Sequence, residues 1–291
     1  MRESLSELLK NDPLRLAGAT AFFTTFALPP ILFILIQILK LILKPQTIRQ
    51  ELNKNLTDIV GPETVKQIID VLRALRNFTE NWWLNIAGFV FLLFVATTLF
   101  KVIRNSINQV WKIRASGHRG LVRTLGDRLQ SIIVIVVAAV LFIVGIAAEA
   151  VQAIIENYLA DLSTQFTFYF KLIVNTVTSL VIVTTWFMMV FRYLPDGRPS
   201  WPVAIVGSLF TSVLFTIGKI ILHFLLSYSN INSFYGTSAS IVLLLLFVFY
   251  SSLILYFGAA FTKIWAIHRK TPITPRSYAT CYRVILEEEH H

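Results

Sequence analysis

Residues 208–227 read SLFTSVLFTIGKIILHFLLS, and most of these side chains are apolar. The stretch is as long as the roughly 20 residues that an α-helix needs to cross a bilayer. A strand of an outer-membrane barrel would instead alternate over about ten residues. The stretch therefore predicts a transmembrane helix, and the presence of Lys219 and His223, one helical turn apart inside it, needs an explanation.

Apolar blocks of this kind recur along the chain. Of the 291 residues, 55% are hydrophobic and 14% are charged, whereas soluble domains carry about 25% charged residues. The blocks cover 17–43, 84–103, 131–152, 168–191, 203–226 and 238–262. We therefore predict an all-α, polytopic membrane protein with six transmembrane helices, forming a single integral membrane domain over 1–286. Residues 287–291 resemble the remnant of an expression tag and are left out of the functional argument.

Charged residues are distributed unevenly between the connections. The connection 103–130 carries six Lys and Arg residues against one Asp. The connection 153–167 carries two acidic residues and no cation, and 227–237 carries no charge. Because basic loops stay on the cytoplasmic side, we predict that both termini are cytoplasmic and that 44–83 is external. Anionic membrane lipids are sufficient partners for the basic loops, and no nucleic-acid partner is expected.

The external loop 44–83 is too long for a simple turn. Apolar residues recur in it at helical spacing, namely Val65, Ile68, Ile69, Leu72 and Leu75. This pattern predicts an amphipathic helix that lies on the outer leaflet or caps the bundle. Residues 3–10 predict a similar interfacial helix on the cytoplasmic side.

A polar ladder runs along the fifth span. Its members are spaced by three or four residues and therefore share one helix face; they are Ser208, Ser212, Thr216, Lys219, His223 and Ser227. A polar face in a membrane should point toward the bundle or a wet cavity rather than toward lipid. Two interpretations stay open. Lys219 lines a substrate or ion pathway, or it snorkels within a packed polar seam.

Two further spans carry candidate pathway residues. Asn175 belongs to a polar stripe on the fourth span. Glu149, near the outer end of the third span, is the one carboxylate in any predicted span. A pair between Glu149 and Lys219 would lower the cost of burying both charges, although Glu149 is explained equally well as an interfacial residue.

Small residues and prolines suggest how the spans pack. Glycines in the spans predict close helix contacts; they are Gly18, Gly88, Gly145, Gly207, Gly218 and Gly258. Pro29 and Pro30 in the first span predict a kink or break, because two backbone donors are lost.

Catalytic patterns are missing from the sequence. The chain contains no HExxH, CxxC, GxSxG or P-loop motif, and His118, His223 and His268 lie in different segments. Metal-dependent hydrolysis and nucleotide-driven pumping are therefore not first choices. We predict no enzymatic activity, no metal site and no cofactor.

Three segments resemble one known family. They are RLAGATAFFTTFALPPILFIL at 15–35, KVIRNSINQVW at 101–111, and the stretch from YLPDG at 193 to GAAFTK at 263. Together they are similar to the YihY family, also called the virulence factor BrkB family. The resemblance covers about 10–265, is strongest over 193–262 and is weak over 44–83. The matching positions are Asn108, Trp111, Leu194, Pro195, Lys219, Tyr228, Tyr235, Gly236, Gly258 and Ala259.

The resemblance implies a bacterial inner-membrane protein with six spans. It leads us to expect a transporter or permease, for a lipid or another anionic amphiphile, with the polar stripe of the fifth span lining the pathway. A structural or assembly protein of the cell envelope is the alternative. The ribonuclease BN label that members of the family have carried ranks last, because nothing in this sequence supplies the metal ligands of a nuclease.

Overall fold

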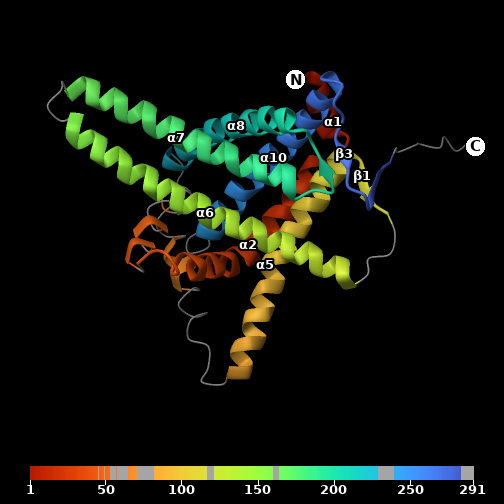
Figure 1. Ribbon diagram of the computed structural model, residues 1–291, viewed down its shortest axis with the longest axis horizontal. Coiled ribbons are helices and arrows are strands. Elements are labelled where there is room, and N and C mark those ends of the chain that lie inside the picture. The colour runs from red at the N-terminus through yellow and green to blue at the C-terminus, as the bar shows by residue number, and fades with distance from the viewer. Residues whose placement is uncertain are drawn as a thin grey trace, which may run out of the picture.

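The computed structural model describes residues 1–44, 46–48, 50–52, 57, 65–70, 82–116, 121–159, 164–228 and 239–282. Each predicted span overlaps one long helix over most of its length (Figure 1). The helices are α2 (Pro13–Leu39), α5 (Trp82–Trp111), α6 (Leu121–Leu159), α7 (Thr164–Tyr193), α8 (Trp201–Tyr228) and α10 (Ala239–His268). The short α1 (Arg2–Leu9) precedes them, as the sequence predicted.

The all-α membrane fold is confirmed. Among the described residues, five helices are long and apolar enough to cross a membrane, and they lie in α2, α6, α7, α8 and α10. The remaining predicted span, 84–103, lies inside the 30-residue α5. The break predicted at Pro29 and Pro30 does not occur, because α2 continues through both residues. The φ angle of proline is itself helical, so α2 keeps its course although each proline loses a backbone hydrogen bond and its ring crowds the carbonyl four residues earlier.

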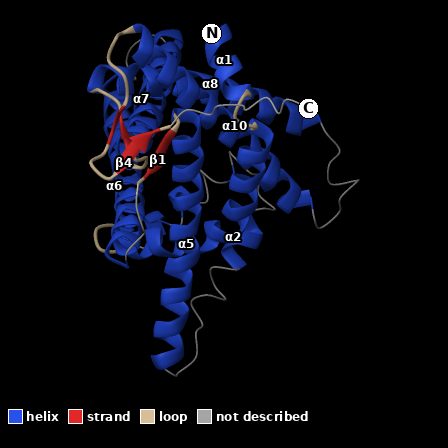
Figure 2. Cartoon of the chain, turned by 90° about the vertical axis from the view of Figure 1, so that its right-hand side faces the viewer, coloured by secondary structure: helices blue, strands red, loops and turns tan. Residues whose placement is uncertain are grey.

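The helices pack around α2 and α10. Helix α2 contacts α5, α6 and α10, while α8 lies between α7 and α10. Helices α6 and α7 run side by side and project together past the rest of the bundle (Figure 1). The first half of α5 projects in another direction, with Phe91 and Phe94 exposed (Figures 1 and 2).

Glycines bring α8 and α10 close together, as their positions predicted. A Cβ atom at Gly207 would collide with Thr262 of α10, and a Cβ atom at Gly258 would collide with Thr211 of α8. Each threonine donates a hydrogen bond to the glycine carbonyl four residues earlier in its own helix, at 2.7 Å. At two places along this contact, a threonine of one helix therefore packs against a glycine of the other. Gly18, in contrast, has no neighbour within 4 Å of such a Cβ.

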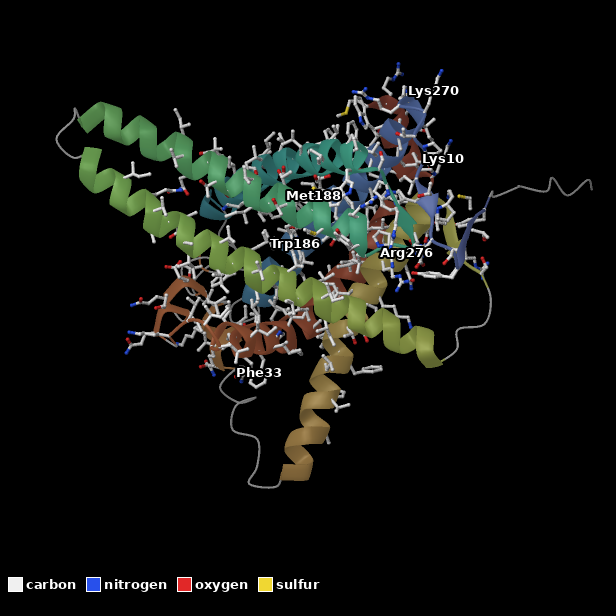
Figure 3. All side chains as sticks on the ribbon, viewed as in Figure 1. Lys10, Phe33, Trp186, Met188, Lys270 and Arg276 are labelled. Atoms are coloured by element: carbon white, nitrogen blue, oxygen red, sulfur yellow. The ribbon has the colours of Figure 1, made fainter. Side chains whose placement is uncertain are left out.

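The chain segments near both termini gather at one end of the bundle. Strand β1 (Ile113–Ala115) pairs antiparallel with β4 (Ala279–Cys281), and β2 (Gly197–Arg198) pairs with β3 (Thr274–Pro275). Residues 269–282 thus join the α5–α6 and α7–α8 connections, which the sequence did not predict. We call α1, the end of α5, residues 194–200 and residues 269–282 the terminal cap. Lys10, Lys270 and Arg276 mark this end in Figure 3, whereas Phe33 lies far from it.

The predicted amphipathic helix in 44–83 is partly described. Residues 65–70 are helical, with Val65 and Ile68 buried while Lys66 and Asp70 are exposed. Ile68 packs in a cluster with Leu39 and other apolar residues of α2. This segment therefore caps the bundle, which was one of its two predicted placements. Leu72 and Leu75 lie outside the described residues.

Candidate functional site

A buried acidic residue connects the α7–α8 turn to α5. Arg104 donates through Nη2 to Oδ1 of Asp196, and Asn108 donates through Nδ2 to Oδ2 at 2.7 Å. The backbone N–H of Asp196 donates in turn to Oδ1 of Asn108 at 2.8 Å. All three residues are at most 6% exposed. Both carboxylate oxygens are thus satisfied, which is the condition under which a buried charge pair is tolerated.

The C-terminal tail adds a further set of contacts to this cluster. The backbone N–H of Arg276 donates to the carbonyl of Asp196 at 2.8 Å, and its guanidinium donates to the carbonyl of Tyr193 at 2.7 Å. The Tyr278 hydroxyl accepts from Arg276 at 3.3 Å and from Arg104 at 3.4 Å. The tail therefore holds the α7–α8 turn against the end of α5.

Apart from Lys219, the described positions that carried the family resemblance converge at the same end. Trp111 donates through Nε1 to the carbonyl of Ala259 at 2.9 Å, and its ring lies 6.4 Å from that of Phe191. Leu194 and Pro195 are buried in the turn before Asp196. Asn108 belongs to the Asp196 cluster, and Gly258 is fixed by its contact with α8. Tyr235, Gly236 and the side chain of Tyr228 lie outside the described residues.

Lysines on α10 and after α5 fasten α1 and the residues that follow it to the rest of the cap. Lys263 donates to Oε1 of Glu7 at 2.6 Å and to the carbonyl of Val110 at 3.0 Å. Lys112 donates to Oδ1 of Asn11 at 2.8 Å. Burial lowers the pKa of Lys112, and although Glu7 opposes that shift, Lys263 adds to it. The cap is consequently a set of interlocking side chains, with no nucleophile–base pair among the residues described above.

Among the described residues, only the first half of the polar ladder on α8 is buried against neighbouring helices. Ser208 and Ser212 are fully buried, and the hydroxyls of Ser212 and Thr184 of α7 are 2.7 Å apart. Thr216 is half-buried and donates to the carbonyl of Ser212 at 2.8 Å. Lys219, however, is exposed. The prediction that Lys219 is shielded within the bundle is therefore wrong for the single chain, and the side chain of His223 lies outside the described part.

The course of α7 explains the exposure of Lys219. A step of seven residues is close to two helical turns, so Lys219 points in nearly the same direction as Ser212, toward the side that meets α7. Val177 and Ile173, seven and eleven residues before Thr184 on the same side of α7, are 52% and 61% exposed. The two helices therefore stop covering each other beyond the Ser212–Thr184 contact. We call this region the open stretch of the α7–α8 interface.

The other predicted pathway residues do not join Lys219. Glu149 is half-buried on α6 and makes other interactions, and the described residues contain no ion pair between it and Lys219. Asn175 is exposed and lies nine residues before Thr184, which places it on the opposite side of α7. Thr178 of α7 instead accepts a hydrogen bond from Gln152 of α6 at 3.1 Å. Ser212, Thr216 and Lys219 thus form one line, without Glu149 or Asn175.

Sequence reasoning missed the charged core of the cap. Arg104 was counted as one of the loop cations that set the orientation, and Asp196 was not singled out. A usable signal existed in the four-residue spacing of Arg104 and Asn108, which puts both on one face of α5. The single acidic residue in the otherwise basic 192–200 connection was the other half of that signal.

A bundle of long apolar helices with a charged cap at one end defines a polytopic α-helical membrane protein. The profile of the virulence factor BrkB family matches residues 4–279, and the chain belongs to this family. The match confirms the resemblance found in the sequence. It also extends into β4, so the tail that closes the cap is part of the family domain.

Related proteins carry the name UPF0761 membrane protein. The one from Psychrobacter sp. is 21% identical over 285 residues, covering 95% of this chain and 50% of that protein. The one from Teredinibacter turnerae is 25% identical over 269 residues, covering 92% and 60%. The one from Glaesserella parasuis is 26% identical over 205 residues, covering 67% and 66%. The chain thus spans about half to two thirds of the length of these relatives. No solved structure matches the chain.

Proposed function

We propose that this chain transports an anionic amphiphile, such as a phospholipid, in the bacterial inner membrane, and that Ser212, Thr216 and Lys219 guide its headgroup. One observation supports the proposal. Lys219 continues the line of buried hydroxyls on α8 but lies where α7 no longer covers that line. A cation at the side of the bundle is accessible to a molecule that arrives through the membrane.

The surroundings of Lys219 fit an amphiphile better than a soluble ion. Ile220, Ile221 and Phe224 beside it are all more than half exposed, and such side chains suit acyl chains. An ammonium among apolar groups costs about 2.5–3.5 kcal/mol at the centre of a membrane helix. An anionic headgroup would offset part of that cost, and the hydroxyls of Thr216 and Ser212 would extend the polar path beyond it.

The orientation of the chain belongs to the same proposal. The basic connections favour a cytoplasmic terminal cap and an external 44–83. The cap would then close the cytoplasmic end, since its polar groups pair with one another. The open stretch of the α7–α8 interface would give lipids access from the membrane. We assign no enzymatic step to the chain.

A second function is favoured by the cap itself. Its interlocking contacts are what a rigid scaffold requires, and a structural or assembly protein of the envelope would use them without moving any substrate. The two proposals differ at Lys219, because a scaffold has no need for a charge at that position.

Purified protein in vesicles that contain fluorescent anionic phospholipid tests the transport proposal. Lys219→Met keeps much of the side-chain length and removes the charge, so flux should fall to the level of empty vesicles. Lys219→Arg keeps the charge and should retain flux. Lys101→Met removes another exposed lysine, on α5, and should also retain it. Normal flux in Lys219→Met, at equal protein abundance, would leave the scaffold as the better explanation.

A further inference from the structure

The charges of α1 are divided between its two faces. On the inner face, Oε1 of Glu7 lies 2.6 Å from Nζ of Lys263, and Oε2 of Glu3 lies 3.6 Å from Nε2 of His268. Leu8 on the same face is buried against the bundle. The Glu7 carboxylate is 16% exposed and paired with Lys263, whereas Glu3 is 68% exposed and lies beside His268 at the edge of α1.

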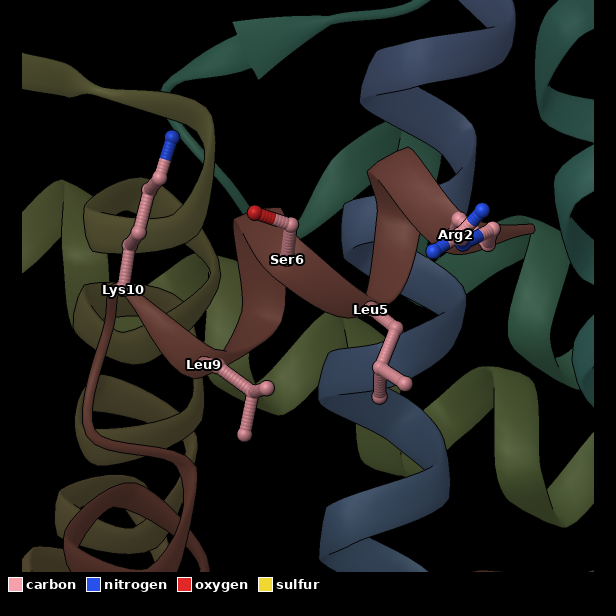
Figure 4. A pocket seen from close by; sticks show the side chains of 5 residues that line it. All are labelled: Arg2, Leu5, Ser6, Leu9 and Lys10. Atoms are coloured by element: carbon pink, nitrogen blue, oxygen red, sulfur yellow. The ribbon is translucent and has the colours of Figure 1, made fainter.

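The outer face combines cations with exposed leucines. Arg2, Leu5, Ser6, Leu9 and Lys10 line a shallow depression (Figure 4). Leu5 is 49% exposed and Leu9 is 62% exposed, and their side chains point the same way in Figure 4. Arg2 and Lys10 lie at the two ends of the depression. This face therefore presents positive charge on either side of an apolar pair, which is the composition of a helix that lies at a membrane surface.

The connection to α2 keeps this face close to the membrane. Three residues, 10–12, separate α1 from α2, and such a segment reaches at most about 10 Å. Helix α2 is a membrane-spanning candidate, and Leu14 in its first turn is 67% exposed. Exposed basic residues at the end of α10, Arg269 and Lys270, lie at the same end of the molecule. The headgroup layer of the surrounding membrane is thus the nearest surface that can cover Leu5 and Leu9.

We propose that the outer face of α1 binds anionic phospholipids of the membrane in which the chain sits. Arg2 and Lys10 contact the headgroup phosphates, and Leu5 and Leu9 contact the upper part of the acyl chains. Charge complementarity favours this partner over a protein, because Arg2 and Lys10 are the charged residues that line the depression, while Glu3 and Glu7 lie beside α10. The proposal does not depend on transport, since it concerns how the cap is held at the membrane surface.

Fluorescence quenching of the full chain in vesicles measures this contact. Ser6→Cys, in a Cys281→Ser background, carries a bimane label in the middle of the outer face. Vesicles contain phosphatidylcholine with phosphatidylglycerol as a quarter of the lipid, and the bromine quencher is placed on one lipid or the other. Both leaflets have the same composition, so the orientation of the protein does not affect the result. We expect brominated phosphatidylglycerol to quench the label more strongly, per mole of lipid, than brominated phosphatidylcholine.

Two double variants distinguish lipid binding at the outer face of α1 from general electrostatic attraction between the protein and anionic lipids. Removing both cations with Arg2→Gln and Lys10→Gln should reduce the preference for phosphatidylglycerol about 30-fold, since one basic residue near an anionic surface contributes roughly fivefold. Arg114→Gln with Arg198→Gln removes the same charge from exposed positions outside α1 and should leave the preference unchanged. The proposal is overturned if the two lipids quench equally, if neither quenches, or if both double variants lose the preference alike.

Discussion

Removing one partner of the buried Arg104–Asp196 pair should destabilise the protein strongly. Arg104→Met leaves the Asp196 carboxylate buried with Asn108 as its remaining side-chain donor. Asp196→Asn replaces one carboxylate oxygen by an NH₂ group. Because Arg104 and Asn108 both donate to this side chain, the new NH₂ faces a donor in either orientation of the amide. Breaking a buried pair in this way costs about 3–5 kcal/mol. We expect each single variant to lose unfolding free energy in this range.

The double variant should recover much of this loss. When Arg104→Met and Asp196→Asn are combined, the new amide can turn its NH₂ toward the methionine and keep its oxygen for Asn108. Replacing a buried ion pair by groups without charge is often close to neutral. We therefore expect the double variant to be more stable than the sum of the two single losses predicts, by about 2 kcal/mol or more.

Unfolding in mixed micelles with increasing sodium dodecyl sulfate, followed by tryptophan fluorescence, measures these free energies. The control applies the same two substitutions to Arg15 and Asp12, an exposed pair at 3.5 Å, where the effect should stay below about 1 kcal/mol. Single variants at Arg104 and Asp196 that cost no more than this control would refute the reasoning. So would strictly additive losses in the double variant.

Three further predictions concern packing, the tail and orientation. Gly258→Val should cost about 1–3 kcal/mol of unfolding free energy, because the new side chain collides with α8. Gly18→Val has free space around its side chain and should cost less. Equal losses for the two variants in the same micelle titration would contradict this prediction. Ending the chain at residue 270 should lower the free energy by at least about 2 kcal/mol, since the two hydrogen bonds from Arg276 to Tyr193 and Asp196 are lost together with the β1–β4 and β2–β3 pairings, and a tail that contributes nothing would show no change. In a cysteine-free background, a membrane-impermeant thiol reagent applied to intact cells should label Asn55→Cys and spare Ser116→Cys, and the opposite result would reverse the orientation.

The membrane fold was predictable because the bilayer imposes a local rule. A spanning helix must be continuous and apolar over its own length, so each of the six blocks could be recognised without reference to any other. The sequence also predicted close helix contacts at Gly207 and Gly258, since glycine allows two helices to approach each other closely. Which residue faces each glycine was not readable from either helix alone.

The charged core of the cap could not be predicted in the same way. Arg104 and Asp196 are 92 residues apart, and a count of loop charges treats every cation as solvated. The strands in residues 271–282 were not predicted, because they form only against partners far away in the sequence. Lys219 was misplaced for a related reason. Periodicity shows which face of α8 a residue occupies, but not where the neighbouring α7 turns away.

Lys219 differs from the other described positions that carried the family resemblance. Asn108 and Trp111 hydrogen-bond across the cap, Leu194 and Pro195 are buried in the turn that they shape, and Gly258 and Ala259 allow α10 to pack closely. Packing is a sufficient reason for each of these residues. It does not explain Lys219, whose side chain is exposed and enters none of the hydrogen bonds or ion pairs among the described residues. A lysine costs more in a membrane than any apolar side chain, and under the transport proposal the headgroup of the substrate offsets that cost.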